Sequence, residues 1–392
     1  MGSGVQSHLT RRQRALPAVS SARLFRSTFR PTYQTKNRAT RMQIEVLDIP
    51  DYEQVVQCRD EASGLHAIIA VHNTVLGPAL GGMRMLPYVG VQEALTDVLR
   101  LSKGMTYKSA VANTGLGGGK CVVIGDPSKD KSEALFRAIG KFVNSLEGKY
   151  ITAEDMNIGI ADLEIVQQET EYVSGLSRAA GSSGNPSPYT AYGCLVGVKA
   201  TCKEAFGSDD LSGRTVVVQG VGAVGGRLAV LLKEAGAKVT ICDINDARVA
   251  ELQAEHGFQV VDDEKHLEVA CDVYAPCARG AGVNDETLPL LKCKVIAGCA
   301  NNILLEPRHA IDLRARGILY APDYVINAGG IINVSLEVKP EGYNEERAIA
   351  LIDQIGDNLS QVYAISKRDD IPTNQAAARL AEERLAAGPA RS

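Results

Sequence analysis

The sequence predicts an α/β fold of two domains, and three observations support this. At 392 residues, with 45% hydrophobic and 22% charged residues, the chain can bury more than one core. After Met42, short β-rich runs alternate with segments of helical periodicity, which is typical of α/β architecture. Residues 181–188 interrupt the pattern with Gly, Ser, Asn and Pro, which indicates a domain boundary or a binding loop.

The leader, residues 1–41, differs from the rest in charge. It holds nine of the 42 Lys and Arg residues and no acidic residue, which leaves 33 basic against 46 acidic residues, about −13, after it. Two interpretations fit: an organelle transit peptide, or an extension upstream of a start at Met42. Because an acidic body repels phosphate backbones, we expect no nucleic-acid partner. No apolar run approaches the roughly 18 residues of a membrane helix, so we expect no membrane span.

The nine cysteines form no CxxC pair, and no nearby His completes a zinc pattern. We therefore expect a reducing compartment, no metal site, and cysteines that act as small apolar side chains. The six histidines are scattered and lie beside no motif, so a histidine-based mechanism has no support. The expected location is the cytoplasm, or an organelle if the leader is a transit peptide.

The first domain is predicted over residues 42–185 as a substrate-binding and oligomerisation domain. Apolar residues spaced by three and four predict one helix over 91–99 and another over 135–146, with Ser132 as the cap of the second. Strands are predicted over 121–124 and 150–153.

The second domain is predicted over residues 186–334, and residues 335–392 are predicted to form helices that close back on the first domain. Thr373 is the expected cap of the last helix, which would end near Gly388. The second domain should contain, in order, strand 215–219, a glycine turn, helix 228–235 closed by Gly236, strand 238–242, and further βα units through Tyr274, 295–297 and 319–320.

A glycine-rich turn, Gly220-Val221-Gly222-Ala223-Val224-Gly225, follows the first strand of the second domain and opens its helix. Gly220 would make the tight turn, Gly222 would let the backbone approach a pyrophosphate, and Gly225 would let helix pack on strand. Asp243 lies 18 residues beyond Gly225, where a carboxylate accepts hydrogen bonds from the adenosine ribose and repels a 2′-phosphate. The pattern predicts a Rossmann domain that prefers NAD to NADP, although Arg248 is close enough in sequence to pair with a phosphate.

Two lysines stand in unusual surroundings: Lys108 ends Gly104-Met105-Thr106-Tyr107-Lys108, and Lys120 follows three glycines, 117–119. Three glycines before a lysine suggest a backbone that lies close to a ligand. A phosphate loop does not fit, because Cys121 stands where GxxxxGK[ST] needs Ser or Thr. Two ammonium groups in one dehydrated cleft would lower each other's pKa and make an amine base available near neutral pH. The alternative is a pair of ordinary surface lysines.

Glu154 and Asp155 close a predicted strand, at the end where open α/β sheets bind ligands. Because neighbouring residues of a strand point to opposite faces, we expect only one of them to enter a cleft. The spacing does not choose between them.

Together these segments resemble the amino-acid dehydrogenase family that includes leucine, valine, phenylalanine, tryptophan and glutamate dehydrogenases. The likeness extends from about Glu45 to the last helix and is strongest towards the leucine-type members, with some phrases shared by the tryptophan-type. It rests on six ordered motifs: Leu76-Gly77-Pro78-Ala79-Leu80-Gly81-Gly82, Gly104-Met105-Thr106-Tyr107-Lys108, Gly117-Gly118-Gly119-Lys120, Thr152-Ala153-Glu154-Asp155, Gly184-Asn185-Pro186-Ser187-Pro188, and Tyr324-Val325-Ile326-Asn327-Ala328-Gly329-Gly330.

The resemblance implies reversible oxidative deamination of an L-amino acid to its 2-oxo acid and ammonia, with NAD as cofactor. It assigns Lys108 to the substrate carboxylate, Lys120 to the activation of water as general base, and Asp155 to the transfer of the amine proton. The choice of Asp155 over Glu154 comes from the family alone.

The resemblance further implies that Asn302 helps to hold the substrate, and that Thr190 and Asn301 hold the nicotinamide end of the cofactor. Family members are oligomers, so a homo-oligomer is expected. A catalytically idle dinucleotide-binding protein or regulatory subunit is the alternative from another class, and it is disfavoured because the lysines and Asp155 are intact.

The expected substrate is apolar. Glutamate-specific members have a lysine and a serine that receive the side-chain carboxylate, and Leu80 and Val334 occupy the matching positions here. An apolar pocket would leave that carboxylate unpaired, which excludes glutamate. Gly81, Met105 and Ile331 would complete the lining. Leucine or another branched-chain amino acid is favoured, with a phenylalanine- or tryptophan-type enzyme as the alternative.

Two positions depart from the leucine-type pattern: Met83, where threonine is usual, and Ile303, where a polar residue is expected. Met83 is expected to reshape the floor of the substrate pocket.

Overall fold

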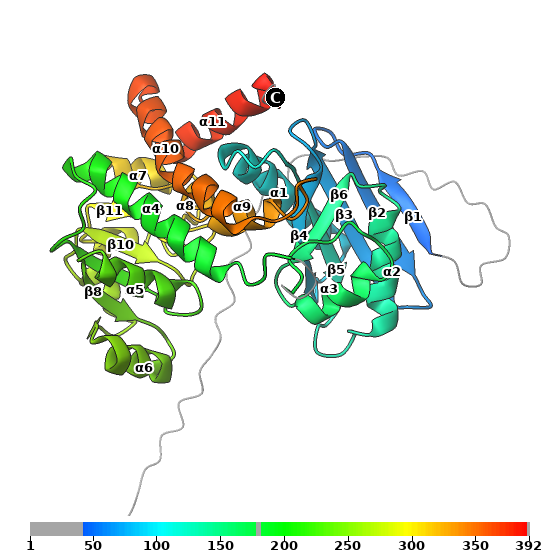
Figure 1. The fold of residues 1–392 in the computed structure, drawn as a ribbon, viewed down its shortest axis with the longest axis horizontal. Helices are drawn as coiled ribbons and strands as arrows, with labels where there is room; N and C mark the ends of the chain where they lie inside the picture. Colours follow the sequence, from blue (N-terminus) through cyan, green and yellow to red (C-terminus); the bar gives the residue numbers. More distant parts are fainter. Residues whose placement is uncertain (1–41, 178–181, 390–392) are drawn as a thin grey trace, which may run out of the picture. The chain divides into compact units, whose positions relative to one another are not determined.

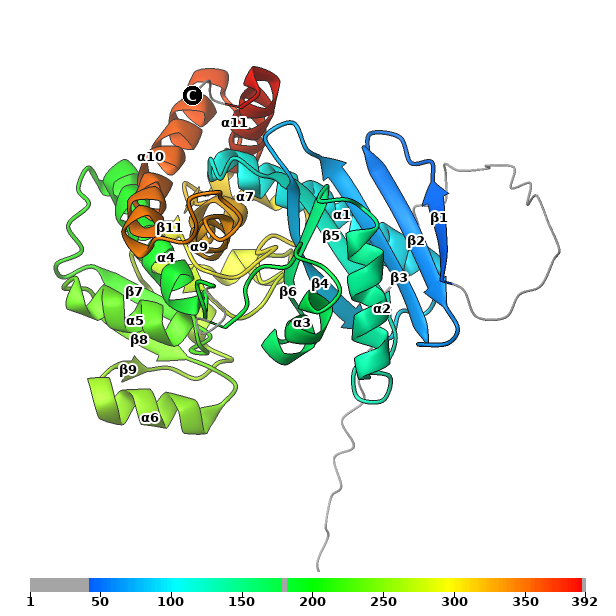
Figure 2. The ribbon, with the colours of Figure 1, turned by 45° about the vertical axis from the view of Figure 1, so that its right-hand side comes forward.

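Two six-stranded β-sheets, each with helices packed against it, make up the described residues, 42–177 and 182–389, of this computed structural model (Figures 1 and 2). The leader, residues 1–41, lies outside them. One sheet in each half of the chain confirms the predicted two-domain α/β fold. In the described part of the chain, no helix is both long and apolar enough to cross a membrane.

The first sheet has the strand order β1-β2-β3-β5-β4-β6. Neighbours from β1 to β5 pair antiparallel, whereas β4 is parallel to both β5 and β6. The strands are β1 (Gln43–Leu47), β2 (Gln54–Asp60), β3 (Leu65–Asn73), β4 (Ala79–Leu86), β5 (Gly117–Ile124) and β6 (Tyr150–Glu154).

Helices cover both faces of the first sheet: α1 (Val91–Val111) covers one, and α2 (Glu133–Asn144) and α3 (Ile160–Gln167) cover the other. Side chains of β3 alternate between the two cores, so Ile69 joins the core under α2 and Ile68 the core under α1. A strand buried on both faces reads as a continuous apolar run. Ser132 caps α2 as predicted, because its side chain accepts the Leu135 N–H at 3.1 Å.

The three glycines 117–119 lie inside β5, where they have a packing role that was not expected of glycines on a strand. A Cβ at Gly118 would lie 2.0 Å from the Thr106 nitrogen of α1, and one at Gly117 would lie 2.1 Å from the Asn73 carbonyl oxygen. Gly118 therefore lets α1 pack directly on the sheet, and the closeness of this backbone to a ligand stays a prediction. The strand begins four residues before its predicted start at Cys121 and includes Lys120.

The second sheet is entirely parallel, with the order β12-β11-β10-β7-β8-β9. Counted from β9, the strands follow in chain order as 3-2-1-4-5-6, which defines the Rossmann fold and puts its ligand crevice between β7 and β10. The strands are β7 (Thr215–Gln219), β8 (Lys238–Cys242), β9 (Gln259–Val260), β10 (Val273–Pro276), β11 (Val295–Ile296) and β12 (Leu319–Tyr320).

The remaining helices pack on the second sheet or continue the chain beyond it. Gly236 closes the helix after the glycine turn, as predicted, with φ +91°. The helices are α4 (Ser187–Phe206), α5 (Gly225–Glu234), α6 (Asp246–His256), α7 (His309–Ala315), α8 (Asp323–Ile326), α9 (Gly329–Ser335), α10 (Glu345–Asp369) and α11 (Thr373–Ala387).

Two details of the helices differ from prediction. Helix α4 begins inside the segment expected to hold no helix, because Pro188 sits in the first turn, where a missing N–H costs nothing. Thr373 does not cap α11: it is the first helical residue, and its hydroxyl donates to the Tyr320 carbonyl at 2.7 Å. The predicted end at Gly388 is confirmed.

The C-terminal helices contact both halves of the chain. Ile352 and Leu359 of α10 belong to the core cluster of the second sheet. From α11, Arg384 donates to the Ala110 carbonyl of α1 at 3.2 Å, and Glu382 accepts from Tyr107 at 2.9 Å. The domain boundaries at 185 and 334 remain a prediction.

Candidate functional site

A cavity of about 760 Å³ is lined by residues of both domains. From the first domain come β4, α1, β5 and the end of β6, and from the second come the loop after β11 and helices α8 and α9. It brings together twelve of the site residues predicted from the sequence: Leu80, Gly81, Met105, Lys108, Lys120, Asp155, Thr190, Val224, Asn301, Asn302, Ile331 and Val334.

Lys120 and Asp155 form an ion pair at the floor of the cavity, with 2.6 Å between Nζ and Oδ2. Only 7% of the Lys120 side chain is exposed. Burial lowers the pKa of Lys120, and the neighbouring Asp155 opposes that shift. Burial would raise the pKa of Asp155, but Lys120 and Arg84 outweigh it and bring the pKa below its ordinary value. Lys120 is therefore an enclosed amine beside a carboxylate that stays ionised.

Arg84, which the sequence analysis missed, shares Asp155 with Lys120. Its Nε donates to Asp155 Oδ2 at 2.8 Å, and its Nη1 donates to Asp97 Oδ2 at 3.2 Å. Tyr88 donates to the same Asp97 oxygen at 2.8 Å. Both cations bond to Oδ2 of Asp155, and no hydrogen bond to its Oδ1 is found among the described residues.

Lys108 joins the two domains across the cavity. Its Nζ donates to Asn327 Oδ1 at 2.7 Å, and Asn327 Nδ2 donates to Asn301 Oδ1 at 2.8 Å. Burial of the ammonium group lowers the pKa of Lys108 to about 8, while Asp323 opposes the shift and Lys120 adds a smaller lowering effect. The predicted depression is thus caused mainly by burial and only in part by the second lysine.

Asp323 anchors the loop that carries Asn301 and Asn302. Its carboxylate accepts the Ile303 N–H at 3.0 Å and the Tyr324 N–H at 2.7 Å. Burial raises the pKa of Asp323, against the effect of these backbone bonds. Asn302 has φ +51°, a left-handed conformation that Asn tolerates better than most residues. Ile303 is fully buried in the core, which explains an apolar residue there.

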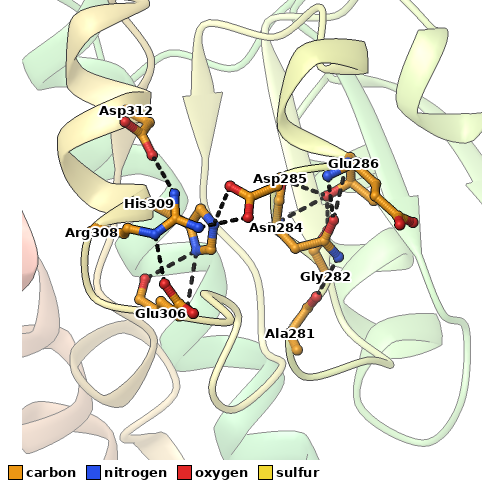
Figure 3. Close-up of polar contacts among 10 residues, drawn as sticks. Ala281, Gly282, Asn284, Asp285, Glu286, Glu306, Arg308, His309 and Asp312 are labelled. Atoms are coloured by element: carbon orange, nitrogen blue, oxygen red, sulfur yellow. Dashed lines mark hydrogen bonds and ion pairs between the residues drawn. The ribbon is translucent and has the colours of Figure 1, made fainter. Parts of the chain in front are cut away.

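A second network, shown in Figure 3, joins residues 281–286 to residues 306–312, which include the end of the same loop. The buried His309 accepts the Glu306 N–H at Nδ1 (3.0 Å), so its Nε2 carries the proton donated to Asp285 at 3.3 Å. Arg308 pairs with Asp285, Glu306 and Asp312 around it. His309 therefore has a structural role, and it is absent from the cavity lining.

The side of the cavity near Leu80 is apolar. Leu80 and Val334 belong to one core cluster, and Ile331 packs against it. Met83 does not contribute: it is fully buried on the opposite face of β4, in the core under α2, so the expectation that it shapes the pocket floor is wrong. Alternation along the strand turns Met83 away from the cavity.

Glu154 and Asp155 both line the cavity, contrary to the expectation that only one would enter it. Asp155 lies just beyond β6, where a bridge to Ile158 turns the chain back, so strict alternation no longer applies. Only Asp155 pairs with Lys120.

The glycine-rich turn joins β7 to α5. Gly220 has φ +91°, and a Cβ at Gly225 would lie 2.0 Å from the Gly220 carbonyl oxygen. A Cβ at Gly222 would meet nothing within 4 Å, so this backbone is open to a ligand. Asp243 accepts the Val221 N–H at 2.7 Å, which places its carboxylate beside the turn. Arg248 pairs with Glu251 at 2.6 Å.

No metal site was expected from the sequence. Among the described residues, the ligand atoms of Cys242, Asp263 and His266 lie within 4.8 Å of one another. Asp263 also pairs with Arg279 at 3.0 Å, and the His266 ring bonds to the Asp263 carbonyl.

The Rossmann sheet with its glycine turn, and an enclosed lysine pair in a cavity shared with a second domain, define a two-domain dehydrogenase. A family model described as "Glu/Leu/Phe/Val dehydrogenase, dimerisation domain" matches residues 52–172, and one described as "Glutamate/Leucine/Phenylalanine/Valine dehydrogenase" matches residues 181–251 and 243–390. The chain belongs to this family.

Relatives are similar over most of their length. A leucine dehydrogenase of Geobacillus stearothermophilus is 58% identical over 86% of this chain and 91% of its own. A phenylalanine dehydrogenase of Thermoactinomyces intermedius is 47% identical over 87% of this chain and 93% of its own. Among solved structures, the L-tryptophan dehydrogenase of Nostoc punctiforme superposes with a TM-score of 0.78 at 42% identity, covering 86% of this chain and 96% of that one.

Proposed function

We propose that this protein is an amino-acid dehydrogenase that catalyses the reversible oxidative deamination of leucine, or another branched-chain L-amino acid, to its 2-oxo acid and ammonia. The observation that carries the proposal is the enclosed Lys120–Asp155 pair, 2.6 Å apart, in the same cavity as Lys108 and next to an apolar pocket. The similarity to several leucine dehydrogenases at 54–58% identity supports leucine-type substrates over aromatic ones.

Lys108 binds the substrate α-carboxylate in this proposal. An ammonium group has three N–H donors, and Asn327 takes one of them at 2.7 Å, so the others can reach a carboxylate in the cavity. Asn327 also orients the amine of Lys108, because the Asn327 side chain itself bonds to Asn301 and to the Cys299 carbonyl. Asn302, which follows Asn301 in the same loop, helps to hold the substrate in this proposal.

Asp155 and Lys120 carry out the proton transfers of the proposed reaction. The free Oδ1 of Asp155 takes the proton of the substrate amine, while Oδ2 stays between Lys120 and Arg84. Neutral Lys120 then removes a proton from the water that attacks the iminium carbon of the substrate. The burial that lowers its pKa makes the neutral form easier to reach than it is for a solvated lysine.

NAD is the proposed cofactor, and the residues of the turn fit it. The open backbone at Gly222 and the N-terminus of α5 suit a pyrophosphate, and Asp243 beside the turn suits a ribose diol. When bound, NAD accepts the hydride from the substrate Cα. Ala223 and Val224 complete the turn, and Thr190 and Asn301 line the cavity towards the nicotinamide. The pairing of Arg248 with Glu251 supports NAD over NADP, since it occupies the nearest guanidinium.

The apolar pocket sets the proposed substrate preference. Leu80, Met105, Ile331 and Val334, with Gly81, line the part of the cavity that would receive the side chain. A glutamate carboxylate placed there would lose its hydration without a partner.

We also propose a homo-oligomer assembled through the first domain. The matching family model is described as a dimerisation domain, and the edge strand β1 exposes Ile44 and Val46 with no partner strand on its outer side in the described chain. A monomer in sedimentation velocity would contradict this.

A panel of L-amino acids tests the function. Leucine, isoleucine, valine, phenylalanine, tryptophan and glutamate are each supplied with NAD, and then with NADP, while NADH or NADPH absorbance is followed. We expect the highest kcat/KM with leucine and NAD, and no turnover of glutamate. An aromatic optimum would replace the substrate assignment with the phenylalanine- or tryptophan-type reading. No turnover of any amino acid would indicate an idle dinucleotide-binding protein.

A further inference from the structure

Strands β10 and β11 are flanked by cysteines at both ends. Their pairing joins Val273 to Val295, a separation of 22 residues in sequence. Cys277 and Cys299 have the same separation of 22 and follow the two strands at their carboxyl ends. Cys271 and Cys293, also 22 apart, precede the strands. The same register, continued past the strand ends, brings the members of each pair close together. At the carboxyl end it has shifted by one residue, because Ala300 and not Cys299 donates to the Pro276 carbonyl.

The backbones at the carboxyl ends stay close beyond the strands. The Ala300 N–H donates to the Pro276 carbonyl at 2.9 Å, and a Cβ at Gly298 would lie 2.3 Å from that oxygen. Neighbouring strands are about 4.7–4.9 Å apart, which is within the Cα separation of about 4.4–6.8 Å that a disulfide needs. The Cys299 thiol interacts with that of Cys277 and with that of Cys194 on α4. None of the nine cysteines takes part in a disulfide.

This carboxyl edge is where the cavity lies. Cys299 lines the cavity directly. Cys277 packs against the glycine turn, because a Cβ added at Gly225 would lie 2.7 Å from the Cβ of Cys277. The Cys299 carbonyl accepts from Asn327, which holds Lys108. Cys277 therefore adjoins the glycine turn, and the backbone of Cys299 contacts the asparagine that bonds to Lys108.

We propose that Cys277 and Cys299 form an oxidisable dithiol in the wall of the cofactor pocket, which an oxidant of the peroxide class converts to a disulfide that impairs dinucleotide binding. The consequence for binding rests on the proposed cofactor, whereas the chemistry of the pair does not. The expectation that every cysteine is merely structural would then fail for this pair.

The reaction proceeds in two balanced steps. The Cys277 sulfur attacks one peroxide oxygen, the O–O bond breaks, and a sulfenic acid and one water form. The Cys299 sulfur then displaces the sulfenic oxygen as a second water, and the S–S bond forms. Two thiols lose two electrons and two protons to the peroxide. Cys277 reacts first because it is partly exposed, whereas burial raises the pKa of Cys299 and disfavours its thiolate.

The pair at the other end of the same strands is a matched control. Cys271 is partly exposed like Cys277, and Cys293 is buried like Cys299. Neither lines the cavity. A disulfide there would leave the cofactor turn in place.

The experiment uses the full chain, first reduced and then freed of reductant. It is treated with hydrogen peroxide with and without NADH, alkylated, digested and mapped by mass spectrometry. NADH binding is followed by fluorescence, and activity is normalised to each variant's own reduced form. We expect a Cys277–Cys299 disulfide whose yield tracks the loss of NADH binding, recovery with dithiothreitol, and slower oxidation with NADH bound.

The variants Cys277→Ser and Cys299→Ser should keep their own starting activity under peroxide, while Cys271→Ser should be inactivated like the parent. In the parent, kcat/KM should fall by about tenfold or more, since displacements of about 1 Å in a site carry penalties of this order. A map without the 277–299 disulfide, or a full yield of it with unchanged NADH binding, would overturn the proposal. The map needs no turnover, so a chain inactive towards leucine would sink the proposed function without affecting this result.

Discussion

The two sheets hold their functional groups in different ways. In the first sheet the reactive side chains are charged and enclosed: Lys120 lies inside β5 with 7% of its side chain exposed, and Asp155 follows β6. In the second domain the cavity is lined by the loop after β11 and by helices α8 and α9, and the open backbone at Gly222 is the proposed contact for the cofactor.

We therefore expect the first domain to supply the groups that react and the second domain to bind the cofactor. Burial in the first domain lowers the pKa of Lys108 and Lys120, and the proposed base is one of these lysines. In the second domain the proposed contacts of the cofactor are mainly those of the backbone at the glycine turn. Isosteric loss of one charge should therefore damage turnover in the first domain, and one added methyl group should damage binding in the second.

The largest effect is expected for Lys120→Met, which removes the amine and keeps an apolar stem. The kcat should fall by about 100- to 10,000-fold, the range for loss of a general base, while the dissociation constant for NADH stays unchanged. Steady-state kinetics and fluorescence titration measure the two quantities. Lys129→Met, on the surface with 75% of its side chain exposed, is the control. Turnover near that of the control would remove Lys120 from the mechanism.

An intermediate effect is expected from single methyl groups in the glycine turn. In Gly225→Ala the new Cβ would meet the Gly220 carbonyl at 2.0 Å, so NADH affinity should fall, and overpacking should lower the free energy of unfolding by roughly 1–3 kcal/mol. In Gly222→Ala nothing lies within 4 Å, so stability should hold while NADH affinity falls. Equal NADH affinity in Gly222→Ala and the parent would contradict the cradle.

The smallest effect is expected for Arg84→Gln, read in the pH profile of kcat. Lys120 is active when neutral, so kcat rises as pH passes its pKa. Arg84 helps to lower that pKa, so its loss should raise the pKa and move the rise to higher pH. Below the rise, kcat should fall, because a smaller fraction of Lys120 is neutral at any given pH. Arg84→Lys, which keeps a charge, should move the profile less. A lower kcat with an unmoved profile would indicate a structural role only.

Local patterns made much of the second domain predictable. The bounds of β7 and β8 follow from an apolar run, a glycine turn and a second apolar run, all within 30 residues, and the structure matches them. The first domain was harder to predict, because the three glycines hide the start of β5. Each glycine is required by a contact with a distant segment: Gly117 with Asn73, Gly118 with Thr106 of α1, and Gly119 with Tyr150.

The missed site residues depend on contacts between distant segments. Arg84 reaches Asp155 across 71 positions, and Lys108 reaches Asn327 across 219. No periodicity or spacing signals such pairs. Helix α4 was missed for another reason: Gly193 and Gly197 lie where a Cβ would meet Ile355 and Ile326, so close packing replaced the apolar stripe that predicts a helix.

Helix α1 lies on the first sheet for most of its length, yet its last residues, Ala110 and Val111, pack in the core of the second domain and accept bonds from Arg384 of α11. This shared helix limits how the protein can be recombined. A chimera that grafts the dinucleotide-binding half of a relative onto this substrate half must bring the matching final turn and its arginine with it. Without them, the contact between α1 and α11 would lose its hydrogen bonds. Lys108, which precedes Ala110 on α1, would then be misaligned.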